Sequence, residues 1–170
     1  MKKYEFTGET KQINLLFRTA TLHRIRAVVE FGLVKIGDLG GWIEKEENLS
    51  HDGKAWVCGD AEVCGDAKVW GNAKVWGNAE VCGDAEVFSA SHVLVIGAIG
   101  SRNDFTTFFR DKDGEITVKC GCFLGKIDRF LEKVASTHGN SKYALVYRAA
   151  VEVAKLQIDL TGEAPEMDEE

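Results

Sequence analysis

The sequence lacks an excess of positive charge and any long apolar run. Lys and Arg number 21 against 27 Asp and Glu, which gives a net charge of -6. A nucleic-acid-binding protein usually carries a basic patch, and we find none. No apolar segment approaches the roughly 18 residues that a membrane-spanning helix requires, and no signal peptide is recognisable. We therefore expect a cytoplasmic protein that binds neither nucleic acid nor membrane.

Proline and paired cysteines are also scarce. The single proline, Pro165, lies in a segment of residues 159–170 that holds six acidic residues and no Lys or Arg, so we expect a disordered acidic tail there. The cysteine count is odd, with residues Cys58, Cys64, Cys82, Cys120 and Cys122. A disulfide framework normally uses an even number, and we interpret all five as free thiols.

What the sequence does contain is a six-residue repeat. Residues 53–88 read GKAWVC, GDAEVC, GDAKVW, GNAKVW, GNAEVC and GDAEVF. Ala and Val are two positions apart in each hexad, so on an extended strand both point to the same side, which we expect to be the core. Gly followed by Asp or Asn suits a tight corner. The repeat predicts a solenoid of short parallel strands, in which three hexads complete one coil.

A coil of eighteen residues places position i against i+18, which arranges the outward side chains in columns. Glu62 and Glu80 share one column, where like charges repel. Aromatic and apolar side chains occupy other columns, and we predict an oligomer interface, most simply of a trimer, from Trp56, Trp70, Trp76, Phe88 and Leu94. The alternative that these rings pack on the C-terminal segment of the same chain remains open.

The segments on either side of the repeat differ in pattern. We expect cap strands over residues 1–35 and a parallel β-helix over 36–105, which Val93, Ile99 and Phe105 would continue. Residues 106–158 predict a β-hairpin around Asp111–Gly114 and a pair of helices, the first ending at His138 and Gly139 and the second beginning near Ser141.

Several ordered motifs together resemble a known kind of protein. The motifs GDLGGWIEKEENLS, GNAKVWGNAEV, IGSRND and Cys120-Gly-Cys122-Phe before two helices with HGN look like small hexapeptide-repeat proteins of phages and prophages. The resemblance implies a mainly β fold, namely a left-handed parallel β-helix with N-terminal cap strands and a small C-terminal α+β segment. It also implies a phage context in a host cell, and oligomeric phage proteins of this size often act against host defence.

Three functions are compatible with this pattern. The first is non-enzymatic, stoichiometric binding of a nucleotide-like anion or a host protein, for which Arg24, Arg26, Arg102, Asn103 and Lys119 are the candidate ligand-binding residues. The second is a hexapeptide-repeat acyltransferase, which would use a histidine as base, although residues 53–88 contain none and only His51 and His92 flank them. The third is a structural component of a virion.

We predict no catalytic residues, no cofactor and no metal site. Cys120, Cys122 and His138 provide at most three zinc ligands where a structural site uses four. If the binding function holds, the partners are a sister subunit and a small anionic ligand or a host protein.

Overall fold

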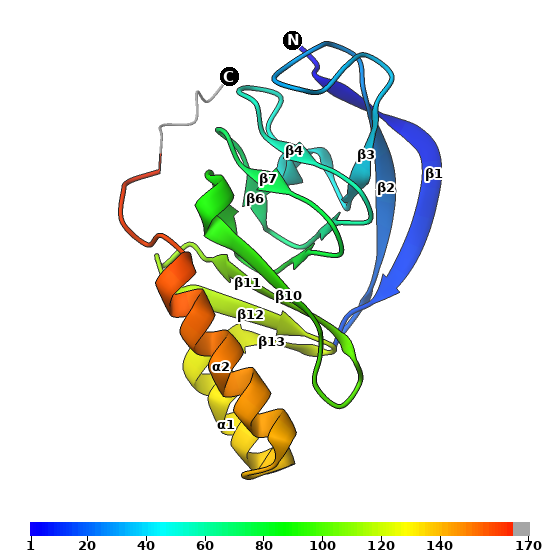
Figure 1. Cartoon of the computed structure of the whole chain (residues 1–170). Helices are drawn as coiled ribbons and strands as arrows, with labels where there is room; N and C mark the ends of the chain where they lie inside the picture. Colours follow the sequence, from blue (N-terminus) through cyan, green and yellow to red (C-terminus); the bar gives the residue numbers. More distant parts are fainter. Residues whose placement is uncertain (165–170) are drawn as a thin grey trace.

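The computed structural model describes residues 1–164 as three connected parts, shown in Figure 1. The N-terminal part is a long antiparallel hairpin of β1 (Tyr4–Asn14) and β2 (Thr19–Ala27). β2 pairs antiparallel with β3 (Leu39–Ile43), which brings the hairpin alongside the repeat. A short 3-10 helix, Glu46–Asn48, follows β3. The hairpin therefore covers one edge of the repeat region.

Each hexad supplies a strand of two residues. These strands are β4 (Trp56–Val57), β5 (Glu62–Val63), β6 (Lys68–Val69), β7 (Lys74–Val75), β8 (Glu80–Val81) and β9 (Glu86–Val87). They pair in parallel as β4 with β7, β5 with β8 and β6 with β9, with Glu62 opposite Glu80 and Lys68 opposite Glu86. The predicted offset of eighteen residues between neighbouring strands is therefore observed in each of these pairs.

The alternation within the hexad decides which side chains are buried. Ala and Val of the hexads are at most 1% exposed, and they form one core with Tyr4, Ile25 and Phe109. Each hexad begins with a glycine of positive φ, and stacking is so tight that a Cβ on Gly53 would lie 2.6 Å from the carbonyl oxygen of Gly71. Only glycine fits there, because both the backbone angle and the space exclude a side chain.

The C-terminal part is a four-stranded antiparallel sheet covered by two helices. The strands are β10 (Val93–Ile99), β11 (Asp104–Arg110), β12 (Ile116–Cys120) and β13 (Phe123–Lys126), in that order, preceded by the 3-10 helix Ala90–His92. Phe109 faces the Ala and Val core, whereas its neighbour Phe108 faces the helices. The sheet is thus shared between two cores.

Helices α1 (Ile127–His138) and α2 (Lys142–Gln157) pack side by side on the outer face of this sheet, as Figure 1 shows. Phe130 and Val134 of α1 and Val151 of α2 are buried against it. Gly139, at φ 57°, ends α1, and its N–H donates to the carbonyl of Ala135. The two predicted helices and the position of the turn between them are therefore observed.

The structure corrects the expectation of a left-handed β-helix over residues 36–105. The described residues form mixed sheets of short strands with two helices, and the strands of this range are distributed among all four sheets. Beyond Phe88 the repeat does not continue, because β10 pairs antiparallel with β11 and so joins the C-terminal sheet. Val93 and Ile99 are only half-buried, and Phe105 is 38% exposed. What the structure shows is a mainly β fold.

Two further expectations concern the C-terminal region. β11 and β12 do flank the turn at Asp111–Gly114, but β10 and β13 extend the expected hairpin to a sheet of four strands. Residues 165–170 of the expected acidic tail, 159–170, lie outside the described residues. Its first part is attached to the molecule, because the Asp159 N–H donates to the Ser91 carbonyl over 3.1 Å and Arg110 donates to the carbonyls of Thr161 and Gly162.

Candidate functional site: two hollows beside the β12–β13 turn

Two hollows lie on opposite faces of the β12–β13 hairpin. Lys119 and Leu124 are paired across the hairpin and point to the side of the repeat, whereas the next pair, Cys120 and Phe123, points to the helices. We call the first hollow the turn cleft and the second the helix-side pocket. The turn cleft measures about 620 Å³ and the helix-side pocket about 180 Å³.

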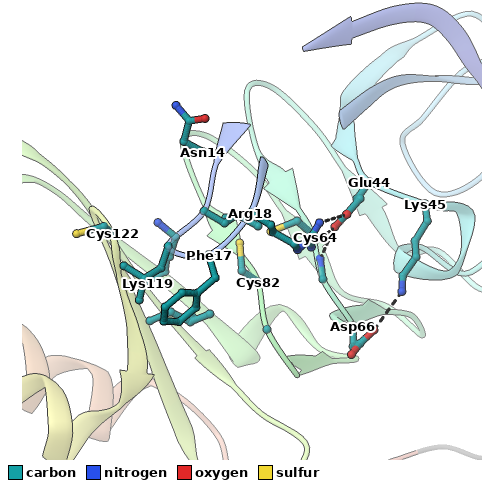
Figure 2. Close-up of a pocket in the computed structure, with 15 residues that line it drawn as sticks. Asn14, Phe17, Arg18, Glu44, Lys45, Cys64, Asp66, Cys82, Lys119 and Cys122 are labelled. Atoms are coloured by element: carbon teal, nitrogen blue, oxygen red, sulfur yellow. Dashed lines mark hydrogen bonds and ion pairs between the residues drawn. The ribbon is translucent and has the colours of Figure 1, made fainter. Parts of the chain in front are cut away.

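The turn cleft lies between the β1–β2 turn, the repeat and β12–β13 (Figure 2). Its charged residues are neutralised in pairs: Arg18 with Glu44, Lys45 with Asp66 at 3.1 Å, and Lys119 with Glu80 at 3.0 Å. The rest of the lining is Asn14, Leu15, Leu16, Phe17, Cys64, Gly65, Cys82, Gly83, Cys122 and Leu124. The cleft is therefore apolar for the most part and carries little free charge.

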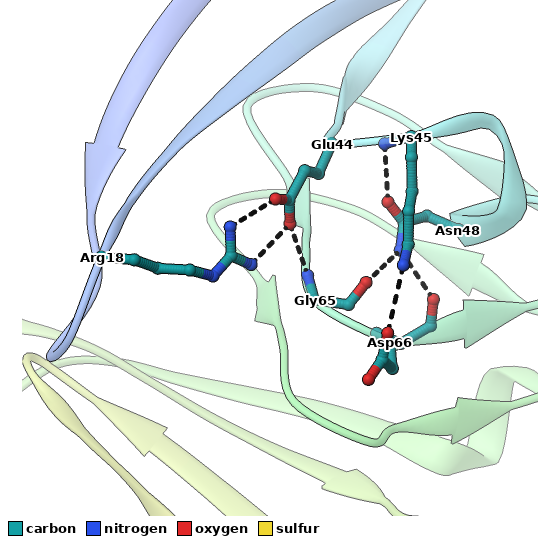
Figure 3. Close-up of polar contacts among 7 residues, drawn as sticks. Arg18, Glu44, Lys45, Asn48, Gly65 and Asp66 are labelled. Atoms are coloured by element: carbon teal, nitrogen blue, oxygen red, sulfur yellow. Dashed lines mark hydrogen bonds and ion pairs between the residues drawn. The ribbon is translucent and has the colours of Figure 1, made fainter.

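Glu44 is held by a network that Figure 3 shows in full. The two terminal nitrogens of the Arg18 guanidinium donate to its carboxylate, one of them over 2.9 Å, and the Gly65 N–H donates to the same group over 2.7 Å. The hydrogen bond from Arg18 is the main reason why the pKa of Glu44 is lowered, against the opposing effect of burial. Glu44 therefore stays ionised and fixes the β1–β2 turn to the repeat.

Lys119 and the two cysteines form the inner wall of the turn cleft. Burial disfavours the charged form of Lys119, but the Glu80 carboxylate outweighs it, so that the pKa of Lys119 is raised. Cys64 and Cys82 are buried neighbours that directly follow β5 and β8. The neighbouring Cys64 thiol and burial raise the pKa of Cys82. A protonated thiol is a poor nucleophile, so the Cys82 thiol is chemically unreactive.

The helix-side pocket has the opposite character. Its cationic side chains are Arg102 and Lys133, and its hydroxyl groups are those of Ser101, Thr106, Thr137 and Tyr147. His138 also lines it, and Asp104 is the one acidic residue in its lining. Among the described residues, neither Arg102 nor Lys133 has a carboxylate within 4.0 Å. This pocket therefore offers positive charge that no ion pair neutralises.

The local backbone makes room for the Arg102 guanidinium. Gly121 has φ 58°, and a Cβ there would lie 3.0 Å from Nη1 of Arg102. A larger residue at 121 would be strained by its backbone angle and would also crowd the guanidinium. Gly100, in the turn before Arg102, is constrained in the same way, because a Cβ would lie 1.8 Å from the Tyr147 hydroxyl. Both glycines thus hold the wall of the pocket in shape.

Cys120 and Tyr147 form the base of the helix-side pocket. The Thr106 hydroxyl donates to Cys120 Sγ over 3.4 Å, and Cys120 Sγ lies 4.0 Å from the Tyr147 hydroxyl. Burial, and then the neighbouring Cys120, raise the pKa of Tyr147 to about 12. The His138 ring stacks on Tyr147 with 5.8 Å between ring centroids. At neutral pH the Tyr147 hydroxyl is therefore protonated and able to donate a hydrogen bond.

The five predicted ligand-binding residues do not come together. Arg102 lines the helix-side pocket, while Lys119 lines the turn cleft and is paired with Glu80. Asn103 occupies the left-handed position of the turn after Arg102, at φ 53°, and does not line the pocket. Arg26 is paired with Glu5, and Arg24 lies over the Trp42 ring at 5.3 Å from its centroid. Arg102 is the member of this set with an unneutralised charge in a hollow.

The predicted interface residues are also distributed unevenly. Trp56 is 5% exposed, against Tyr4 and Phe31, and Trp70 is 6% exposed, with its ring centroid 4.9 Å from that of Phe88. Leu94 packs among the residues under the helices. Trp76, by contrast, is 58% exposed. Most of these rings are therefore covered by their own chain, but Trp56 packs on residues of the N-terminal segment and Trp70 on Phe88 of the repeat, and not on the C-terminal segment that the sequence left open as the alternative.

The histidines considered as bases lie away from both hollows. His51 stacks on Tyr4 and accepts a hydrogen bond from the Lys3 N–H over 3.1 Å, and His92 accepts one from the Phe88 N–H over 3.2 Å. Burial lowers the pKa of both rings. His138 lines the helix-side pocket together with Cys120 and Cys122. Within residues 1–164, no group of three or more His, Cys, Asp or Glu side chains is placed to hold a metal ion.

Comparison with known proteins gives no family. No family model and no curated protein matches the chain. The resemblance to phage and prophage hexapeptide-repeat proteins was wrong, since neither a family match nor the arrangement of the described sheets supports it. In the part of the chain that the structure describes, no helix is long and apolar enough to cross a membrane.

Sequence reasoning missed most of the helix-side pocket. Lys133, Thr137 and Tyr147 come from helices that were treated only as apolar packing elements. A signal was present on α1, where Lys133 and Thr137 are four residues apart and flank the buried Val134. Their spacing places both at one border of the buried face of α1. The polar turn that carries Arg102 lies in a distant part of the sequence, so the sequence alone did not bring these residues together.

Proposed function

We propose that the protein binds a small oxyanion, such as the phosphate group of a nucleotide-like ligand, stoichiometrically in the helix-side pocket. The observation that carries this proposal is the convergence of Arg102 and Lys133 on a pocket lined by hydroxyl groups, with no carboxylate within 4.0 Å of either cation among the described residues. Arginine and hydroxyl donors are the usual partners of phosphate oxygens.

The size and the donors of the pocket support this ligand class. A volume of about 180 Å³ suits a phosphate group with little else, so that the remainder of a larger ligand would extend out of the mouth. The Tyr147 hydroxyl stays protonated, because its pKa is raised to about 12, and it can therefore donate a hydrogen bond to an oxygen of the ligand. Asp104 is already engaged, since its carboxylate accepts a hydrogen bond from the Phe105 N–H over 2.7 Å. The net charge of the pocket is positive.

The test is calorimetric titration of the intact protein with inorganic phosphate, pyrophosphate, AMP, cyclic nucleotides and a coenzyme A thioester. A charge-assisted hydrogen bond contributes about 1.5–3 kcal/mol, so Arg102→Gln and Lys133→Gln should each weaken binding by roughly 10- to 100-fold. Arg26→Gln is the matched control, because Arg26 is exposed and paired with Glu5. Binding that Arg102→Gln leaves unchanged, or that Arg26→Gln weakens equally, contradicts the proposal.

A homo-oligomer, with three subunits favoured, is part of the proposal and rests on Trp76. This side chain is 58% exposed beside the repeat, and large exposed aromatic groups often mark contact surfaces. Trp76→Glu should lower the mass measured by light scattering. Leu156→Glu is the control and should leave this mass unchanged; Leu156 lies on α2 and is 90% exposed. A monomeric wild type contradicts this part.

The finer arrangement of the repeat is also a proposal. We infer that the parallel pairs of residues 56–87 are the sides of one short three-sided coil with Ala and Val inside. The eighteen-residue offsets and the hydrogen bonds from Trp56 N to Ala73 O (3.0 Å) and from Glu62 N to Ala79 O (2.9 Å) support it. Val69→Asp should unfold the chain, because it places an unpaired charge in that core. A soluble variant with unchanged melting temperature contradicts the arrangement.

A further inference from the structure

The turn cleft has no part in the proposed anion site, yet it is the larger of the two hollows, at about 620 Å³. All three cations in its wall face carboxylates at ion-pair distance, as described above for Arg18, Lys45 and Lys119. An anionic ligand would have to separate one of these pairs before it gained a contact. The cleft is therefore unsuited to the ligand class of the helix-side pocket.

Its walls expose an unusual amount of apolar surface. Phe17 is 94% exposed and Leu16 is 66% exposed, both at the tip of the β1–β2 turn. Leu124, on the opposite wall, is 43% exposed and leans over the repeat, where a Cβ on Gly83 would lie 3.2 Å from its Cδ2. Large apolar side chains at the tip of a turn cost free energy in water, so their place at the mouth of a cleft points to a ligand.

The floor of the cleft extends this apolar surface inwards. Cys64 and Cys82 form a small buried cluster with Leu22 and Trp42, and Leu15 packs against it from the turn. Figure 2 shows Cys64 and Cys82 between Phe17 and Lys119 on one side and Lys45 and Asp66 on the other. A molecule in the cleft would thus contact thiols and aliphatic groups at its inner end and the Phe17 ring at its outer end.

We propose that the turn cleft binds an uncharged, mainly apolar small molecule. Ligand pockets commonly measure about 300–1,000 Å³ and are lined by apolar side chains with a few fixed polar groups, and the cleft fits this description. The ion pair of Arg18 with Glu44 holds the β1–β2 turn in place and so fixes the outer wall. This inference is independent of the anion site, because the two hollows lie on opposite faces of β12–β13 and their linings share only Cys122 in the turn between these strands.

The experiment is a fluorescence titration of the intact protein with Nile red, an uncharged apolar dye. We expect saturable binding with one dye per chain, and we expect Phe17→Ser and Leu124→Ser each to raise the dissociation constant about tenfold, as loss of one well-packed apolar side chain predicts. Both residues are exposed, so neither substitution should affect folding. Leu156→Ser is the matched control, because Leu156 is 90% exposed on α2.

Four results would overturn the inference. The first is dye binding that Leu156→Ser weakens as much as Phe17→Ser does. The second is an absence of saturable binding by the wild type. The third is a rise in mass on dye binding, measured by light scattering, that Phe17→Ser abolishes, because the cleft would then be a contact between copies of the chain. Saturating phosphate and Arg102→Gln should leave dye binding unchanged, and displacement by phosphate would also count against an uncharged ligand.

Discussion

Replacement of Asn48 tests how the 3-10 helix after β3 is fixed to the repeat. The Asn48 side chain is fully buried, and its amide makes three hydrogen bonds, which Figure 3 shows. Its oxygen accepts from the Lys45 N–H over 2.9 Å, and its nitrogen donates to the carbonyls of Gly65 over 3.1 Å and Ala67 over 2.9 Å. One side chain thus satisfies backbone groups of two separate segments.

The expected cost of Asn48→Ala follows from these contacts. A buried polar group left without its partner costs about 1–3 kcal/mol. In Asn48→Ala, three backbone groups lose their hydrogen-bond partner, namely the Lys45 N–H and the carbonyls of Gly65 and Ala67. Part of this cost is recovered if water enters the space. We expect the free energy of unfolding to fall by about 3 kcal/mol. Asn48→Asp should be at least as harmful, because a carboxylate oxygen would replace the amide donor opposite the carbonyls of Gly65 and Ala67.

Urea denaturation followed by circular dichroism measures this change, with Asn78→Ala as the control, because Asn78 is exposed in its hexad and should change stability by no more than about 0.5 kcal/mol. A loss below this control value for Asn48→Ala would refute the reasoning. An Asn48→Asp variant as stable as the wild type would do the same, because it would mean that the amide donor is not needed.

Two further predictions concern charged groups. Glu80→Lys should destabilise the protein, because Glu80 is paired with the nearly buried Lys119 and Glu62 with Lys11. This is contrary to the expectation from repulsion between Glu62 and Glu80 in one column. A melting temperature equal to or above that of the wild type would contradict the prediction. Burial lowers the pKa of Lys3 to about 8, below its ordinary value of 10.5, so the unfolded chain binds more protons between these values and stability should rise with pH from about 8 towards 10. Lys3→Met should remove this rise when urea midpoints are compared across that range, and an unchanged slope would contradict the assignment.

Much of the repeat could be predicted from the sequence, because its geometry is local. The inward Ala and Val, the corner glycines and the pairing of Glu62 with Glu80 all follow from a period of six and from the alternation of a strand. The family resemblance rested on the hexads and on short flanking motifs, and such local patterns carry no information on how the segments around the repeat pair in space. The antiparallel return of β10 depends on pairing with β11, which a repeat pattern does not encode.

The candidate site could be predicted only in part. Arg102 was found because it stands out in a polar turn, but its role depends on Lys133 and Tyr147, which reach the same pocket through the packing of α1 and α2. Arg26 and Lys119 looked equally suitable in the sequence, and only their neighbours Glu5 and Glu80 show that their charges are already neutralised. Charge alone therefore could not distinguish a free cation from a paired one.

The alternation of Phe108 and Phe109 on β11 also determines how the molecule can come apart. Each of these neighbouring residues is a fully buried member of a different core, so the strand is a common wall between the repeat and the helical layer. If the helices detach, the wall loses its packing on one face, and the repeat then rests on a sheet that is only half supported. The C-terminal helices are consequently structural partners of the repeat, and truncation before α1 would damage parts of the molecule that the helices never touch.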